Sequence, residues 1–205
     1  MKPQAVKMLL VMLSVLALFV AGFAQENPKP TDKPQTQDKS TKADKTQTTH
    51  HDQMSKPLDH EFAMKAAKDG MAEVELGQLA TTKASNDDVK TFAQRMVDDH
   101  SKANDELKNL AATKGITLPT ALDATGKKMV DDLSKLSGAD FDRKYMEMMV
   151  KDHDKAVALF EKQATSGKDV ELKAWADKTL PTLREHQKMA RDTAAKVGAK
   201  LTPAK

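Results

Sequence analysis

The chain has 205 residues, no cysteine and a formal net charge of +3 at pH 7. The absence of cysteine excludes disulfides, thiolate metal sites, cysteine nucleophiles and a lipid anchor attached to cysteine. Lysine alternates with aspartate and glutamate instead of forming a basic stripe, which argues against a nucleic-acid-binding protein.

Residues 1–24 have the pattern of a secretory signal peptide. Lys2 and Lys7 precede an apolar run, and Gly22 and Ala24 offer small residues for cleavage. We expect cleavage near Ala24, which predicts a periplasmic, secreted or outer-membrane-associated protein with no transmembrane span in the mature chain. An uncleaved anchor is the alternative, because an apolar run of about 17 residues is at the short end of what can cross a bilayer.

Residues 25–57 contain no Leu, Ile, Val or aromatic residue and consist mainly of Lys, Thr, Gln, Asp and Pro. Such a segment cannot bury enough apolar surface to offset the entropy of ordering it, so we expect a disordered linker. The linker could attach the protein to an envelope protein or a cell-surface partner. His50, His51 and Met54 within it could collect metal loosely, or they could simply belong to a polar tail.

The remaining residues, 58–205, form the predicted folded domain. Apolar residues recur every three or four positions, a spacing typical of amphipathic helices. Long helices are predicted at about residues 59–83, 85–114, 139–165 and 169–196, with a short helix at about 127–136. This pattern predicts an all-α, antiparallel four-helix bundle with a short extra helix between the second and third long helices. We expect up-down-up-down connectivity in preference to a crossover along the whole bundle.

Local signals mark the helix ends. Ser85 and Ser137 are each followed three residues later by aspartate, which predicts two capping boxes. Gly115 suits the left-handed position that ends a helix, and the last helix is expected to end before Gly198. Pro181 falls inside the last helix, where we expect a kink over about 177–181 because proline lacks the amide proton.

A five-residue pattern, Met-Val-x-Asp-His, occurs at 96–100 and again at 149–153. Met and His four residues apart lie on the same helical face, so each copy presents a thioether beside an imidazole. His186 with Met189 forms a third pair, and all three histidines lie on the apolar faces of their helices. We therefore expect the three imidazoles to meet inside the bundle.

Imidazole with thioether suits copper(I), and imidazole with carboxylate suits zinc or copper(II). The candidate donors are the three histidines, the neighbouring methionines and a glutamate of the first helix: His100, His153, His186, Met96, Met149, Met189, and Glu73 or Glu75. Asp99 and Asp152, each next to a histidine, are candidates to orient the imidazoles by hydrogen bonding. No other cofactor is indicated.

Two other interpretations remain open. The histidines and aspartates could form a purely structural polar layer that fixes helix register, in which case the protein would be an envelope stress or interaction scaffold. Buried histidines would also make such a layer sensitive to acid. A di-iron carboxylate site is excluded, because the residues three before the histidines are Val97, Val150 and Leu183 rather than glutamate. No nucleophile elbow, phosphate loop or His-Glu-x-x-His motif is present, so we do not expect an enzyme.

Several strings carry a family resemblance: Phe141-Asp142-x-x-Tyr145, Met149-Val150-x-Asp152-His153-x-Lys155-Ala156-Val157, Leu172-Lys173-x-Trp175-Ala176 and Thr179-Leu180-Pro181-x-Leu183-x-x-His186. They resemble a ferritin-like domain of unknown function found in predicted outer-membrane or periplasmic bacterial proteins. The resemblance covers about 58–197 and implies a signal peptide, a ferritin-like helical bundle and no established activity. The repeated pattern is also similar to the Met-Ile-x-His-His motif of an exported helical family linked with copper and silver handling. Asp99 and Asp152 stand where that motif has its first histidine.

Overall fold

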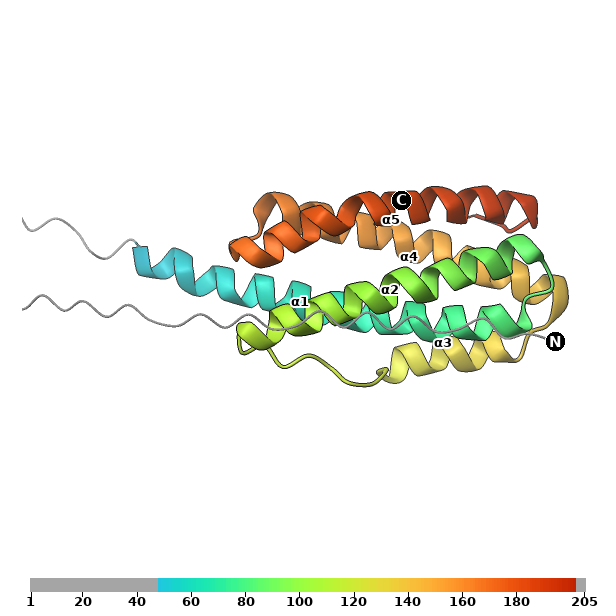
Figure 1. Cartoon of the computed structure of the whole chain (residues 1–205), viewed down its shortest axis with the longest axis horizontal. Helices are drawn as coiled ribbons and strands as arrows, with labels where there is room; N and C mark the ends of the chain where they lie inside the picture. The colour runs from blue at the N-terminus through green and yellow to red at the C-terminus, as the bar shows by residue number, and fades with distance from the viewer. Residues whose placement is uncertain (1–47, 202–205) are drawn as a thin grey trace, which may run out of the picture. The chain divides into compact units, whose positions relative to one another are not determined.

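The computed structural model describes residues 48–201, with side chains described from 58 onward. In this part of the chain there are five helices and no strand: α1 (Thr48–Lys83), α2 (Asp87–Thr113), α3 (Ala124–Ser134), α4 (Gly138–Ser166) and α5 (Val170–Lys196) (Figure 1). The all-α prediction, including the short helix before the third long one, is confirmed. Among the described helices, none combines the length and the apolar character that a membrane span requires. The predicted signal peptide lies outside the described residues.

The first helix is longer than predicted. α1 begins at Thr48, whereas the sequence pattern placed its start near Asp59 and assigned the preceding residues to a disordered linker. Once a helix is nucleated, each added residue gains a hydrogen bond for the conformational freedom it loses. Extension of α1 beyond its apolar stripe therefore needs no apolar signal of its own.

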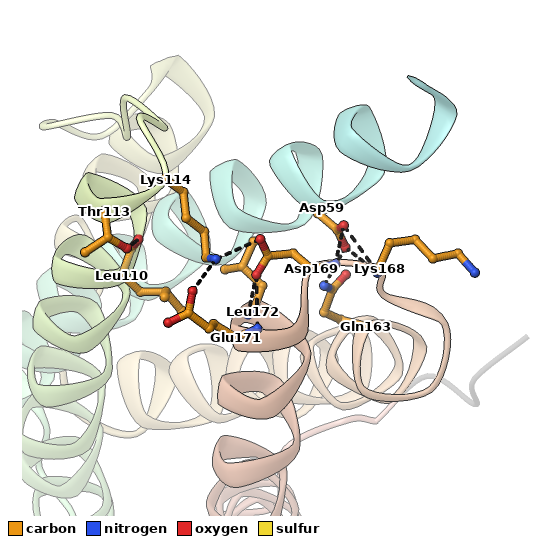
Figure 2. Close-up of polar contacts among 9 residues, drawn as sticks. All are labelled: Asp59, Leu110, Thr113, Lys114, Gln163, Lys168, Asp169, Glu171 and Leu172. Carbon is orange, nitrogen blue, oxygen red and sulfur yellow. Dashed lines mark hydrogen bonds and ion pairs between the residues drawn. The ribbon is translucent and has the colours of Figure 1, made fainter. Parts of the chain in front are cut away.

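Polar contacts at one end of the bundle show which helix ends meet there. The carboxylate of Asp59, about three turns into α1, accepts a hydrogen bond of 3.1 Å from the backbone of Lys168, in the turn between α4 and α5. Lys114, just after α2, contacts Asp169 at 2.7 Å and Glu171 at 2.7 Å (Figure 2). The part of α1 around Asp59, the end of α2, the end of α4 and the start of α5 therefore share this end.

The opposite ends of the same helices meet at the other end of the bundle. The carboxylate of Asp142, in α4, accepts a hydrogen bond of 3.0 Å from the backbone of Ser85, between α1 and α2. Lys196, at the end of α5, pairs with Asp88 at 2.8 Å. In chain order the long helices thus run up, down, down and up, and the prediction of up-down-up-down connectivity is wrong.

The connection between α2 and α4 crosses the length of the bundle, and α3 lies within it (Figure 1). An 11-residue helix spans only about 16 Å, so the extended residues before α3 supply the rest of the distance. α1 packs on α2 and α4, α5 packs on the same two helices, and α3 covers α1 and α4. Because of the crossover, every pair of neighbouring long helices is antiparallel, as the predicted fold class requires.

The helix ends differ in part from the predicted caps. Gly115 has φ of 66°, so its predicted left-handed conformation is confirmed, and Gly198 has the same conformation, with φ of 69°, after α5. Both predicted capping boxes are wrong. The N-cap of α2 is Asn86, whose side chain accepts from the amides of the second and third helical residues, while the hydroxyl of Ser85 donates to Asp142 instead. Ser137 makes no side-chain capping bond.

Pro181 lies inside α5, which is one continuous helix from Val170 to Lys196. The hydroxyl of Thr179 donates to the carbonyl of Trp175 at 2.7 Å, a local interaction of the kind that bends helices. The predicted kink at this position stays a prediction.

The apolar core consists of two clusters. The first lies toward the α1–α2 turn, and its large members are Leu76, Val89, Phe92, Met96, Leu133, Phe141, Tyr145, Met146, Met149 and Val150. The second lies toward the α4–α5 turn, and its large members are Phe62, Leu107, Val157, Phe160, Leu172, Trp175, Leu180 and Leu183. Along each long helix a buried polar residue falls between the two clusters: Glu73, His100, His153 and His186. We call these four residues the polar layer.

Candidate metal centre

The three histidines of the polar layer come together from three helices, α2, α4 and α5. Their ring centroids are 5.7 Å apart for His100 and His153, and 5.4 Å apart for each of the other two pairs. One nitrogen from each ring can be chosen so that all three lie within 4.8 Å of one another. The helical period places each histidine in an apolar seam, and the packing of the bundle brings the seams to the same level.

Hydrogen bonds define the tautomers of two rings. Nδ1 of His153 donates to the carbonyl oxygen of Met149, one turn earlier, at 2.9 Å. Nε2 of His186 donates to the carboxylate of Asp99 at 2.8 Å. The opposite nitrogens, Nε2 of His153 and Nδ1 of His186, are buried without a partner, as is Nε2 of His100. Each ring therefore has a buried nitrogen without a protein partner.

All three rings are neutral at physiological pH. Burial, reinforced by the charges of the other two imidazoles, lowers the pKa of His100 from 6.5 to about 3. Burial and the proximity of His186 lower the pKa of His153 to about 4. Burial also lowers the pKa of His186, although the carboxylate of Asp99 opposes the shift. A neutral imidazole with a free lone pair is the form that binds a metal ion.

Glu73 adds a carboxyl group from α1. It is buried, its Oε1 lies 4.0 Å from Nδ1 of His153, and its Oε2 has no partner. Burial, with the charges of Asp152 and Asp69, holds the pKa of Glu73 well above its ordinary value. Of the two glutamates considered from sequence, Glu75 is exposed. Two residues along a helix turn a side chain about 200° around the axis, so only one of the pair can face the interior.

The two aspartates of the repeated pattern have different environments. Asp99 bonds to His186 and to Arg95, so it orients an imidazole on another helix. Burial alone would raise the pKa of Asp99, but these two hydrogen bonds bring it below its ordinary value. Asp152 instead pairs with Lys155 at 3.2 Å and makes no hydrogen bond to an imidazole. The prediction that Asp152 orients a histidine is therefore wrong, because its helix turns it toward α1 instead.

The three methionines lie on one side of the polar layer. Met96 and Met149 are fully buried in the first apolar cluster, and Met189 is partly buried against it. α2 and α4 run in the same direction, so a methionine four residues before the histidine falls on the same side in both. α5 runs in the opposite direction, so Met189, which follows its histidine, falls on that side too. The thioethers are thus part of a packed apolar cluster.

A cavity of about 520 Å³ reaches the polar layer from one side. Its wall includes His100, His153 and Glu73, together with residues around the start of α3. No local sequence signal indicates this cavity, since it depends on how the crossover connection lies over α1 and α4.

The donor set fits a transition-metal ion. Three neutral imidazole nitrogens with one nearby carboxyl oxygen are ligands that zinc and copper(II) accept, and three protein ligands leave a position open. Protein contacts satisfy one nitrogen of His153 and of His186 and leave the other nitrogen free, the arrangement in which a second partner orients a metal-binding imidazole.

Fold and site together define a four-helix bundle with a crossover connection and a buried three-histidine cluster. The chain belongs to the family described as a domain of unknown function, DUF4142, whose profile matches residues 43–193. No curated protein sequence matches the chain.

Two solved structures share the fold. A DUF305 fragment from Deinococcus radiodurans is 14% identical, with a TM-score of 0.60 and coverage of 68% of this chain and 97% of that one. A DUF305 protein from Streptomyces coelicolor, whose name describes it as secreted, is 15% identical, with a TM-score of 0.60 and coverage of 72% and 98%. At these identities the comparison supports the helical fold alone.

Proposed function

We propose that this protein binds one divalent transition-metal ion, copper(II) or zinc, through His100, His153 and His186. The observation that carries the proposal is a cluster of three buried, neutral imidazoles: one nitrogen of each ring lies within 4.8 Å of the others, and each ring has a nitrogen without a protein partner. Leaving a buried polar group without a partner costs about 1 to 3 kcal/mol. A metal ion would satisfy all three nitrogens at once.

The nature of the fourth donor favours a divalent ion over copper(I). Glu73 offers a carboxyl oxygen at the level of the histidines, and a bound cation would displace its proton. The methionine sulfurs that would suit copper(I) belong to the first apolar cluster, where they have a packing role. We assign Glu73, rather than Met96, Met149 or Met189, as the group that supplements the three imidazoles.

The proposed setting is the bacterial envelope or the exterior. The predicted signal peptide supports export, and the predicted linker before α1 would connect the bundle to an envelope or cell-surface partner. The proposed role is binding rather than catalysis, because the site supplies ligands and an orienting carboxylate but no nucleophile activated by a base.

Metal uptake by the mature chain tests the proposal. The other three histidines should be replaced first as a control, with His50→Ala, His51→Ala and His60→Ala together. Of these, His60 is exposed on α1 and could bind metal at the surface. We expect this control variant to take up one equivalent of copper(II) or zinc, measured by calorimetry and elemental analysis. Adding His153→Leu, which keeps the side chain large and apolar, should abolish uptake while the helical circular dichroism signal remains.

A specific observation supports the alternative of a structural polar layer. The bonds from His186 to Asp99 and from His153 to Met149 tie helices and turns together without any metal. This alternative predicts no stoichiometric uptake by the control variant. Uptake that survives His153→Leu would likewise contradict the metal site proposed here.

A further inference from the structure

Three carboxylates line the same cavity and lead toward the polar layer. Asp69 and Glu73 lie one turn apart on α1, and Asp152 lies on α4 next to His153. Their side chains are 47%, 8% and 27% exposed, respectively, so exposure falls from Asp69 through Asp152 to Glu73. The last of the three is buried, lines the cavity and has an unpartnered oxygen.

The three groups interact electrostatically. Burial raises the pKa of Asp152, and the charge of Asp69 adds to the shift. Burial raises the pKa of Glu73, and the charges of Asp152 and Asp69 raise it further. A cation between these carboxylates would relieve their mutual repulsion.

Two lysines accompany the outer carboxylates. Lys65 pairs with Asp69 at 2.9 Å and Lys155 pairs with Asp152 at 3.2 Å, with lysine side chains 48% and 69% exposed. Solvent-exposed pairs of this kind contribute little and exchange readily with solvent. No lysine or arginine is paired with Glu73 among the described residues, so the innermost carboxyl group is left for an incoming cation.

We propose that the cavity is the entry route of the metal ion, along which Asp69, Asp152 and Glu73 pass a divalent cation from the surface to the three histidines. This inference rests on the proposed metal site. It assigns Asp152, which does not orient a histidine, a role in the rate of uptake. Carboxylates that line a cleft raise the local concentration of cations and accelerate their association.

α4 offers a matched control for Asp152. Asp154 lies two residues further along the helix and has the same side-chain exposure, 27%. It accepts hydrogen bonds from Gln187 and Arg191 of α5 and does not line the cavity. Asp152→Asn and Asp154→Asn therefore remove the same charge from two faces of one helix.

Stopped-flow quenching of Trp175 by copper(II) measures the rate. Trp175 is the only tryptophan of the chain and lines the same cavity. In the control variant, with alanine at positions 50, 51 and 60, we expect Asp69→Asn with Asp152→Asn to lower the bimolecular rate constant of copper(II) binding about tenfold. The stoichiometry should stay at one ion, and Asp154→Asn should change the rate less than twofold. Glu73→Gln should slow the final entry and weaken retention.

Salt provides a second readout that a structural role would not affect. Raising the ionic strength from about 0.01 to 0.15 M shortens the screening length from about 30 to 8 Å. The uptake rate of the control chain should fall, whereas the double variant should respond less. Equal rates for the double variant and Asp154→Asn would overturn the entry route, as would loss of stoichiometric uptake in Asp152→Asn, which would make Asp152 a ligand. Absence of uptake in the control chain would instead overturn the metal site itself.

Discussion

The α1–α2 and α4–α5 hairpins share one framework but fill it differently. Asp59 in α1 accepts hydrogen bonds from the turn between α4 and α5, and Asp142 near the start of α4 accepts from the turn between α1 and α2. The two aspartates are 83 positions apart. The N-caps Asn86 and Asp169 are separated by the same interval. Each hairpin thus supplies an aspartate that accepts hydrogen bonds from the turn of the other hairpin.

Residues of α1 and α4 that are 83 positions apart differ in size where they face the interior. α1 presents small residues where α4 presents large ones: Gly77 corresponds to Phe160, and Ala66 to Met149. A Cβ on Gly77 would lie 2.9 Å from the side chain of Val97, so α1 and α2 are in close contact there. The bulky side chains of α4 occupy the interior that α1 leaves free.

The histidines do not follow the framework. The positions that correspond to His153, His100 and His186 are Gly70, Leu183 and Ala103. The repeated Met-Val-x-Asp-His pattern relates α2 to α4, which are parallel and belong to different hairpins. The framework of the bundle is thus nearly two-fold, whereas the site is built from non-equivalent positions.

The largest effect is expected from removing the aspartates that accept hydrogen bonds from the turn of the opposite hairpin. Asp142→Ala should lower the free energy of unfolding by about 3 to 4 kcal/mol, because it leaves two backbone amides and the Ser85 hydroxyl without their charged acceptor. Asp59→Ala should cost about 2 to 3 kcal/mol, since it leaves two backbone amides and the amide group of Gln163. Urea denaturation measures both. A cost below 1 kcal/mol for either variant would show that the turns are held by other contacts.

Acid should weaken the metal-free bundle at the polar layer. Because burial lowers the pKa of His100 and His153, the folded protein binds fewer protons than the unfolded chain below pH 6.5. Each of these two histidines therefore lowers the free energy of unfolding by about 1.4 kcal/mol for each pH unit that the pH falls. Glu73 acts in the opposite direction, because its raised pKa favours the folded state as pH falls toward 4.5. Between pH 6.5 and 4.5 Glu73 therefore offsets part of the loss from the two histidines, whereas His186, whose pKa burial also lowers, adds to the loss.

Replacing His100 by its counterpart in the other hairpin sharpens this test. His100→Leu should reduce the loss by about 1.4 kcal/mol per pH unit and raise stability at pH 7.5 by about 1 kcal/mol, because it removes an unpartnered buried nitrogen. Urea midpoints at pH 5 and 7.5, measured with a chelator present, report both effects. Identical midpoints for the natural chain at the two pH values would contradict the prediction.

The smallest effects concern the close approach of α1 and α2. Gly77→Ala should destabilise by about 1 to 2 kcal/mol, because the new Cβ would meet Val97 and the carbonyl oxygen of Ala93 at 3.1 Å. Gly70→Ala should be neutral or stabilising by up to about 1 kcal/mol, since the Asn104 side chain can move and alanine favours the helix. Thermal unfolding compares the two, and an equal loss in both variants would mean that the hairpin cannot adjust at either site.

The sequence alone determined the helices and the inward position of the histidines. Both depend on local periodicity, because a spacing of three and four residues places side chains on one face whatever lies opposite. The left-handed glycine at 115 is a local feature as well, which is why it too was predictable.

Three features depend on long-range packing: the direction of α4, the inward position of Glu73 rather than Glu75, and the different partners of Asp99 and Asp152. The direction of α4 depends on the path of the crossover connection, whose length allows it either to return along the bundle or to stay at one end. The capping of Ser85 and Asn86 was likewise decided by Asp142, which is remote in sequence. Contacts between distant segments carry no periodic signal, so these features follow from packing rather than from local pattern.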